Sequence, residues 1–328
     1  MMQAAVLEEL GSVPQFGSFR EPTVEPGETL IHVSAAAIKP VDRAIASGAH
    51  FASPRQLPVV PGLDGVGRLG DGSRVYFSAF RPPFGAMAQR AAASWYVGVP
   101  EGLDDALAAA IVNPALGAWL PLVWRGALRA GETVLVMGAT GSAGRLAVAA
   151  ARLLGAGRIV AAGRRQDVLA SLPVDATIDL KLQGDELKEA IGAAAGDSGY
   201  DLVIDYVWGP ATGSLIAALC SHGVQARRKA ADAGIRIVNV GEMGGQSITL
   251  PAAALRSAPL QILGSGPSNF PPQDRMRAIV AEILSHAAEG ALALPMRTVP
   301  LSAVSEAWGA ASTSQERLVL VPSAAEAR

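Results

Sequence analysis

Cysteine is almost absent from this chain of 328 residues, and its absence excludes two kinds of structural support. The one cysteine is Cys220, so neither a disulfide within the chain nor a structural zinc site built from cysteines can form. Cys220 ends a helical stretch, where we interpret it as a small buried hydrophobe rather than a nucleophile. Histidine is also scarce, and no metal-ligand spacing links His32, His50, His222 and His286.

Charged and aromatic residues are few as well, at 17% and 5% of the chain. The net charge is −2, and the one basic run, at 227–229, is interpreted as a solvated helix face, so neither nucleic acid nor an anionic membrane is an expected partner. The N-terminus lacks the basic and long apolar regions of a secretory signal. Because Gly, Arg or Asp interrupts the apolar stretches before about 18 residues, we expect no membrane span and a cytosolic protein.

Apolar residues make up half of the chain, and its length predicts two domains. Residues 1–112 contain short candidate strands, such as 29–35 and 74–77, separated by turns rich in Gly and Pro. Residues 113–264 alternate strands with helices, and the strands are expected at 132–137, 158–162, 176–180, 200–206, 235–240 and 260–263. This alternation predicts an α/β fold with a doubly wound parallel sheet of six strands. Residues 265–328 are too few for a domain, and we expect them to pack on the first one.

The most informative motif is a glycine-rich turn between a buried strand and a helix. It reads Gly138, Ala139, Thr140, Gly141, Ser142, Ala143, Gly144. Glycines permit the tight turn and let the backbone approach a pyrophosphate, while the helix N-terminus offers free N–H groups and a partial positive charge. We therefore predict a dinucleotide site; the alternative is a tight turn without a ligand.

The end of the second strand distinguishes the two nicotinamide cofactors. An NAD site usually places a carboxylate there, which accepts hydrogen bonds from the ribose hydroxyls. This chain has Gly163, Arg164 and Arg165 instead. Because an arginine can pair with a 2′-phosphate through two parallel hydrogen bonds, we predict NADPH, with Arg164 as the first candidate. The alternative is that the arginines only cap or solvate the next helix.

Other candidate ligand-binding residues follow the later strands, because the carboxyl ends of parallel strands form the binding edge of this fold. Val207 and Trp208 follow the fourth strand, Gly241 follows the fifth, and Ser265 to Phe270 follow the sixth. We expect Val207, Gly241 and Ser265 near the cofactor. The two aromatic side chains, Trp208 and Phe270, are expected near the substrate.

Five segments resemble the medium-chain dehydrogenase/reductase superfamily, and within it the zinc-independent quinone oxidoreductase branch. In chain order they are Met2-Gln3-Ala4-Ala5-Val6, Lys39-Pro40-Val41-Asp42, Pro61-Gly62-Leu63-Asp64-Gly65-Val66-Gly67, Asn113-Pro114-Ala115-Leu116-Gly117-Ala118-Trp119 and Arg317-Leu318-Val319-Leu320-Val321. The resemblance implies a GroES-like β-rich catalytic domain over 1–112, a Rossmann NADPH-binding domain over 113–264, and a return of 265–328 to the first domain.

The resemblance also implies roles for single residues. Asn113 and Arg317 would contribute to the cofactor site, and Phe51 would lie beside the nicotinamide with Phe270 opposite, although either aromatic ring could belong to the core instead. The unpaired edge of the strand at 260–263 would join two copies into a homodimer.

A catalytic metal is not expected. Alcohol dehydrogenases of this superfamily hold zinc with a Cys and a His, and this chain has Lys39 and either Leu63 or Asp64 at the matching positions. An ammonium at Lys39 would repel Zn²⁺. Without a Lewis acid, the favoured acceptors are quinones and activated alkenes, because hydride delivery to them gives a delocalised anion.

Lys39 and Asp42 are the candidate catalytic residues. The family usually has Asn at the position of Lys39. The lysine would donate a hydrogen bond to the substrate oxygen or pair with Asp42; the alternative is that it is an ordinary cation in solvent. Asp42 is interpreted as ordering the loop rather than acting as a base.

The sequence thus predicts an NADPH-dependent, zinc-free reductase of a quinone or an α,β-unsaturated carbonyl. Two alternatives stay open: an enoyl-thioester reductase, and an NADPH-binding sensor or structural protein without turnover. The departure at Lys39 and the segment 221–234, which has a helix-like pattern of unassigned purpose, keep the second alternative open.

Overall fold

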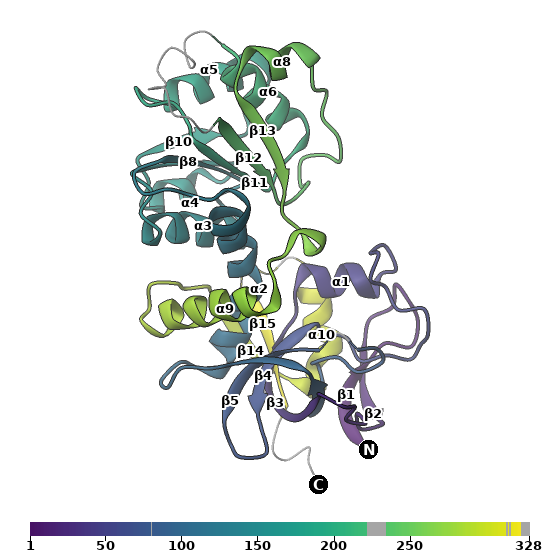
Figure 1. The fold of residues 1–328 in the computed structure, drawn as a ribbon. Helices are drawn as coiled ribbons and strands as arrows, with labels where there is room; N and C mark the ends of the chain where they lie inside the picture. Colours follow the sequence, from purple (N-terminus) through teal and green to yellow (C-terminus); the bar gives the residue numbers. More distant parts are fainter. Residues whose placement is uncertain (80, 222–233, 313, 315, 323–328) are drawn as a thin grey trace. The chain divides into compact units, whose positions relative to one another are not determined.

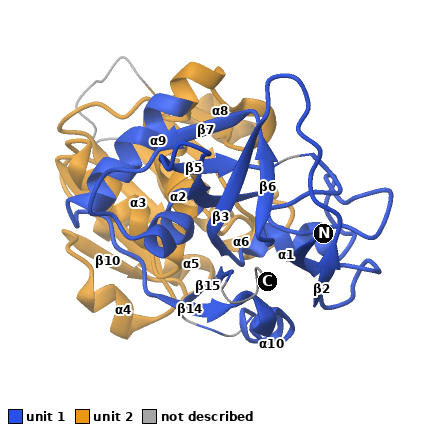
Figure 2. Ribbon diagram, turned by 90° about the horizontal axis from the view of Figure 1, so that it is seen from below, with its two compact units in different colours: residues 1–113, 277–328 blue, residues 114–276 orange. Residues whose placement is uncertain are grey.

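The computed structural model describes residues 1–79, 81–221, 234–312, 314 and 316–322, and the chain forms two compact units. Unit 1 comprises Met1–Asn113 and Arg277–Arg328, and unit 2 comprises Pro114–Met276. Figure 2 colours the two units and shows that unit 1 combines both ends of the chain. His222, the basic run at 227–229 and all but the ends of the segment 221–234 lie outside the described residues.

Unit 1 is built on two β-sheets. A seven-stranded sheet has the order β14-β15-β3-β4-β5-β7, with β6 paired to β3, and a separate pair joins β1 to β2. The strands are β1 (Met2–Val6), β2 (Gln15–Phe19), β3 (Thr29–Ala37), β4 (Asp64–Arg68), β5 (Arg74–Ser78), β6 (Arg90–Ala93), β7 (Trp95–Gly98), β14 (Met296–Pro300) and β15 (Arg317–Val321). Only β14 and β15 pair in parallel; the other pairings are antiparallel.

The tail of the chain completes this sheet. β15 pairs with β3, with Val319 opposite Ala37 and Leu320 opposite Ala36. The end of β3 is a run of three alanines, Ala35 to Ala37, and all of them are buried. The helices are α1 (Pro40–Ala46), α2 (Asp105–Leu120), which continues into unit 2, α9 (Gln273–Ala288) and α10 (Val304–Ala310), with a 3₁₀ turn at Leu301–Ala303.

Unit 2 contains a six-stranded, fully parallel sheet in the order β10-β9-β8-β11-β12-β13. Its strands are β8 (Thr133–Met137), β9 (Arg158–Gly163), β10 (Ala176–Asp179), β11 (Leu202–Asp205), β12 (Ile235–Asn239) and β13 (Leu260–Gly264). Its helices are α3 (Ser142–Leu153), α4 (Gln166–Ser171), α5 (Gly184–Ala194), α6 (Gly209–Leu219) and α8 (Ala252–Ser257), with a π-helical turn at Pro121–Arg125 and a 3₁₀ turn at Pro267–Asn269.

The arrangement in unit 2 confirms the doubly wound α/β prediction. Figure 1 shows α5, α6 and α8 on one face of the sheet and α3 and α4 on the other. Because both faces are covered, the central strands are continuous apolar runs, and β8 is buried at every position. The strand order reverses between β8 and β11, and ligands of this fold bind outside the carboxyl ends of the strands at such a point.

One expectation from the sequence is corrected, and another is refined. The apolar stretches do not all end early: the helical stretch Asp105–Arg125, with 21 residues, is the one in the described chain long and apolar enough to cross a membrane, by length and composition. Of its most apolar window, 72% is buried, as in the core helix of a globular domain. Cys220, expected to be a small buried hydrophobe, is half-buried at the end of α6 and packs against the hydrophobic core of unit 2, with Sγ 3.7 Å from the Ala254 carbonyl.

Candidate functional site

The glycine-rich turn runs from the end of β8 to the start of α3. Gly138 has a φ of +91°, a left-handed conformation in which a side chain is strained. An added Cβ would also lie 3.2 Å from side-chain atoms of both Tyr206 and Val207. The N–H groups of Gly138 and Ala139 both donate to the Ala162 carbonyl at 2.9 Å. The turn is therefore fixed to β9 on one side and to the residues after β11 on the other.

Two further glycines let α3 lie directly against the strand ends. A Cβ on Gly144 would be 2.3 Å from the Gly138 carbonyl oxygen and 2.7 Å from Ala139 Cα. A Cβ on Gly163 would be 2.4 Å from Cγ2 of Thr140. Neither position has room for a larger residue without a shift of the turn.

The N-terminus of α3 is open. Its N-cap residue, Gly141, is exposed, and no side chain caps the helix. The N–H groups of a first helical turn have no partner within the helix, and they carry a partial positive charge. A cradle that a Cβ would fill, next to an uncapped helix N-terminus, fits the pyrophosphate of a dinucleotide.

The two arginines after β9 lie at this same edge but differ in their contacts. The Arg165 side chain donates to the Thr140 carbonyl within the turn. Arg145 of α3 approaches the same oxygen with its Nε at 3.4 Å. Arg164, by contrast, is exposed at the end of β9. Arg165 therefore supports the turn, and Arg164 is the one available to an external phosphate.

The loop after β11 is organised by a residue that our sequence reasoning missed. Asp205 is fully buried, and one carboxylate oxygen accepts the N–H groups of Val207 at 2.8 Å and Trp208 at 3.0 Å. The other oxygen accepts the Thr212 hydroxyl at 2.6 Å. Burial raises the pKa of Asp205, although these hydrogen bonds oppose the rise. A carboxylate at the end of an apolar strand, just before a helix, was the available signal.

Trp208 has an unusual backbone. Its φ of +55° and ψ of −162° lie in a region that is essentially restricted to glycine. The next residue, Gly209, also has a positive φ, and a Cβ there would lie 2.6 Å from the Gly244 carbonyl oxygen. Asp205 therefore holds a strained loop beside the glycine-rich turn.

Tyr206 is a second missed residue. Its hydroxyl donates to the Gly117 carbonyl of α2 at 2.8 Å, and burial raises its pKa. The backbone of Tyr206 also accounts for Gly241, where a Cβ would lie 2.9 Å from the Tyr206 carbonyl oxygen. The predicted residue Gly241 thus lies against the loop that follows β11.

The remaining predicted residues of this edge are less constrained. Ser265 follows β13, and its N–H donates to the Asn239 carbonyl at 2.8 Å. Phe270 ends the adjacent 3₁₀ turn and is 45% exposed, so its alternative assignment to the core is wrong. Asn113 is half-buried in α2 and is the last residue of the first segment of unit 1.

Lys39, the first candidate catalytic residue, lies at the junction of β3 and α1 and is completely buried. Its ammonium lies 3.1 Å from carboxylate oxygens of both Asp42 and Asp64. It also donates to the Ala37 carbonyl at 3.1 Å. The alternative of an ordinary cation in solvent is therefore wrong. The second candidate, Asp42, also accepts the Lys39 N–H at 3.0 Å, so it closes the first turn of α1.

Burial controls the ionisation of this cluster. It tends to lower the pKa of Lys39, but the carboxylates of Asp42 and Asp64 outweigh it, and the Lys39 pKa lies above its usual value. Burial also raises the pKa of Asp64, although the nearby charge of Lys39 acts to lower that pKa. With two carboxylate partners at 3.1 Å, the side chain of Lys39 is a charged ammonium. Burial and the neighbouring Asp64 raise the pKa of Tyr76, which hydrogen-bonds Asp64 as a neutral phenol.

Arg317 lies at the start of β15, beside the same cluster. Its Nη1 donates to the Ile38 carbonyl at 3.1 Å. Burial lowers its pKa, although the carboxylates of Asp42 and Asp64 oppose this. Arg317 was expected at the cofactor site, and within unit 1 it supports the connection between β3 and α1.

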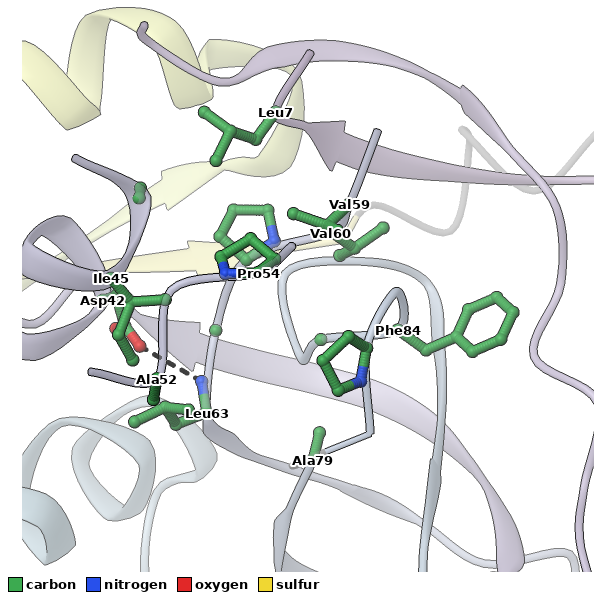
Figure 3. A pocket seen from close by; sticks show the side chains of 15 residues that line it. Leu7, Asp42, Ile45, Ala52, Pro54, Val59, Val60, Leu63, Ala79 and Phe84 are labelled. Carbon is green, nitrogen blue, oxygen red and sulfur yellow. Dashed lines mark hydrogen bonds between the residues drawn. The ribbon is translucent and has the colours of Figure 1, made fainter. Parts of the chain in front are cut away.

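A pocket of about 110 Å³ in unit 1 lies next to Asp42 (Figure 3). Its lining is apolar apart from Asp42 and includes Leu63 and Phe84. The other carboxylate oxygen of Asp42 accepts the Leu63 N–H at 3.1 Å, drawn as a dashed line in Figure 3. Asp42 therefore fixes one wall of the pocket. The volume is below the roughly 300 Å³ at which pockets for drug-sized ligands begin.

Phe51 is not among the residues that line this pocket. It is 81% exposed and packs against His50, with ring centroids 4.3 Å apart. The alternative that Phe51 belongs to the core is therefore wrong.

The residues present do not fit a catalytic zinc. At the two positions that the resemblance relates to zinc ligands, the side chains are the ammonium of Lys39, which offers no lone pair to a metal, and either the apolar Leu63 or Asp64, whose carboxylate lies 3.1 Å from that ammonium. Within the described part of the chain, no group of three His, Cys, Asp or Glu side chains is placed to hold a metal ion.

Comparison with known proteins gives relatives along most of the chain, although no family model matches it. A probable NADPH-dependent quinone reductase of Emericella nidulans is 31% identical over 234 residues, which is 68% of this chain and 63% of the fungal protein. The quinone oxidoreductase of Sus scrofa is 31% identical over 195 residues, 56% of this chain and 59% of the porcine protein. The matches thus span less than two thirds of either relative.

A solved structure covers the whole fold. The quinone oxidoreductase of Thermus thermophilus, described also in complex with NADPH, superposes with a TM-score of 0.73 at 27% identity, over 98% of this chain and 100% of the bacterial chain. The sheet order, the glycine-rich turn and these relatives all indicate the same family. The chain therefore belongs to the medium-chain dehydrogenase/reductase superfamily, in its quinone oxidoreductase branch.

Proposed function

We propose that the protein is an NADPH-dependent reductase that transfers hydride to a quinone or an α,β-unsaturated carbonyl without a catalytic metal. The observation that carries the proposal is the open N-terminus of α3 next to the glycine-rich turn. Unit 2 would bind the dinucleotide, and unit 1 would contribute to the acceptor site. The relatives named as quinone reductases support the same function.

The cofactor assignment depends on the arginines after β9. The turn and the first N–H groups of α3 would hold the pyrophosphate, and Val207, Gly241 and Ser265 would line the same edge. Arg164 would pair with the 2′-phosphate, because its side chain is exposed while Arg165 is engaged by Thr140. When bound, NADPH would supply the hydride from C4 of its nicotinamide.

The acceptor class follows from the chemistry of unit 1. The ammonium of Lys39, with either Leu63 or the Asp64 carboxylate that pairs with it, takes the positions where a zinc-dependent relative would hold its Lewis acid, so the acceptor would stabilise its own developing charge. Quinones and enones do so by delocalisation. Asp42 and Lys39 then act as positioning residues, because Asp42 orders the wall at Leu63 and the Lys39 donors are already satisfied.

The remaining parts of the proposal concern assembly and location. β13 is an edge strand with half-exposed residues, which suits pairing with a second copy in a homodimer. Light scattering should then give twice the chain mass of 33.5 kDa, and a mass of one chain would refute the dimer. A cytosolic location is also part of the proposal.

The test is a steady-state assay with NADPH and NADH, using 1,4-benzoquinone, an enone and a crotonyl thioester as acceptors. Quinone or enone turnover with NADPH supports the proposal, and turnover of the thioester alone would support an enoyl-thioester reductase. Tight NADPH binding without any turnover would support a sensor or structural protein.

Arg164→Ala tests the cofactor contact. Loss of a charge-assisted pair should raise the KM for NADPH about 10–100-fold with little change for NADH. Arg165→Ala is the matched control: it should weaken both cofactors alike, since Arg165 supports the turn. Equal use of NADH by the native protein, with no effect of Arg164→Ala, would refute the NADPH assignment.

A further inference from the structure

The ammonium of Lys39 is saturated with oxygen partners. A lysine ammonium has three N–H donors, and the structure supplies three acceptors at 3.1 Å: the Ala37 carbonyl, an Asp42 oxygen and an Asp64 oxygen. The acceptors come from the end of β3, the first turn of α1 and the start of β4. No donor is left for a ligand, and the side chain is completely buried.

The charges around this ammonium are balanced only when it is present. Asp42 and Asp64 are 2% and 4% exposed, so neither can exchange its partner for bulk water. The groups that face them are the Lys39 ammonium, the Arg317 guanidinium and the neutral Tyr76 hydroxyl. Without Lys39, two buried carboxylates would share the single charge of Arg317. The remaining cavity would be lined by oxygens and would be negative.

We propose that Lys39 is a built-in cation: it fills an oxygen-lined site that binds a divalent metal ion once the ammonium is removed. Two carboxylates and a main-chain carbonyl are the ligands that hard cations such as Mn²⁺, Mg²⁺ and Ca²⁺ prefer. In the native protein the lysine does the same structural work without a metal. It ties β3, α1 and β4 together and holds the Asp42 carboxylate that fixes Leu63.

The inference is independent of the proposed function, because it concerns only the cluster in unit 1 and its stability. Its failure would leave the NADPH assignment untouched, and loss of that assignment would leave the cluster as it is. For the same reason the test measures binding and thermal unfolding rather than turnover.

The experiment compares the native protein with Lys39→Ala after removal of metals by EDTA. The melting temperature of Lys39→Ala should be lower, and MnCl₂ at a hundredfold excess over its Kd should raise it by about 5–10 °C. MnCl₂ should not change the melting temperature of the native protein or of the control variant Lys181→Ala, which makes the same substitution at an exposed lysine. Calorimetry should find one Mn²⁺ per chain in Lys39→Ala only.

A second variant identifies the ligands. In Lys39→Ala/Asp64→Asn the Mn²⁺ response should disappear, because one carboxylate ligand is lost. If Lys39→Ala does not fold alone, refolding from urea with and without MnCl₂ gives the same comparison. A folded Lys39→Ala that neither binds Mn²⁺ nor responds to it would overturn the proposal, as would a response that survives Asp64→Asn.

The pair Lys39→Met and Asp64→Asn gives an independent check without any metal. If the ammonium balances the buried carboxylate, the double variant should lose clearly less thermal stability than the sum of the two single losses. Additive losses would show that Lys39 and Asp64 act separately, and the proposal would fail.

Discussion

Gly144 and Gly213 offer a matched test of the packing that shapes the glycine-rich turn. Both lie within helices of unit 2, and alanine is favoured over glycine in a helix interior by about 0.8–1.0 kcal/mol. At Gly213 nothing lies within 4 Å of an added Cβ, so Gly213→Ala should be more stable by up to about 1 kcal/mol. At Gly144 the same Cβ meets backbone atoms of the turn at 2.3, 2.7 and 2.9 Å.

Those backbone atoms cannot rotate away, so the cost at Gly144 should reach the upper end of the roughly 1–3 kcal/mol of an overpacked site. After the gain in helix propensity, Gly144→Ala should lose about 2 kcal/mol. The two variants should then differ by about 3 kcal/mol, or about 6–12 °C in melting temperature.

Circular dichroism during heating and urea titration measures this difference, and a fluorescence titration with NADPH measures its functional effect. Gly144→Ala should bind NADPH at least about tenfold more weakly, because the shifted turn no longer fits a pyrophosphate. Gly213→Ala should bind like the native protein. If the two variants were equally stable, the close packing of α3 on the turn would not be the reason for glycine at position 144.

Two other predictions concern buried charges. Burial raises the pKa of Asp205 in the folded protein, so the folded state binds a proton there more tightly than the unfolded state does. The stabilisation from this proton is complete below a pH of about 3.9, the pKa of an unfolded aspartate, and is lost as the pH rises through the folded pKa. The native protein should therefore lose stability relative to Asp205→Asn from acid to neutral pH in urea titrations; a difference independent of pH would contradict this. Arg236 is 6% exposed and bonds Glu132 at 2.5 Å, so Arg236→Met should cost about 3–5 kcal/mol in the same assay. Arg152→Met, which removes the exposed pair with Asp175, should cost less than about 1 kcal/mol, and equal losses would refute the role of burial.

Local patterns were sufficient for much of unit 2. The buried run of β8 and the turn after it are contiguous in sequence, and the atoms that exclude a side chain at Gly144 belong to Gly138 and Ala139 of the same turn. Such features are predictable because the atoms that determine them are neighbours along the chain.

The cluster around Lys39 was not predictable in this way. Lysine is almost never fully buried unless it is paired, and one of its partners, Asp64, is 25 residues away. Nothing near Lys39 in sequence reports that β3, α1 and β4 meet there. Sequence reasoning recognised Lys39 and Asp42 as candidates but could not establish that the ammonium has no free donor.

The different contacts of Arg164 and Arg165 were equally impossible to predict from the sequence. Both residues have the same chemistry and follow the same strand, and only the direction of each side chain separates them. Asp205 was missed because a lone carboxylate after a strand has many possible roles. Its three hydrogen bonds become visible only when the loop conformation, including the positive φ of Trp208, is known.

The pairing of β15 with β3 has a consequence for the order of folding during synthesis. Unit 2 is continuous in sequence and can fold as soon as residue 276 has left the ribosome. Unit 1 is completed later, because the end of β3 at Ala36 and Ala37 receives its partner only when residues 317–321 have been made, although β4 and β6 pair with the rest of β3. Until then the Lys39 cluster lacks Arg317, and β3 lacks its β15 partner at Ala36 and Ala37. The end of β3 at Ala36 and Ala37 is thus completed only after all of unit 2 has been made.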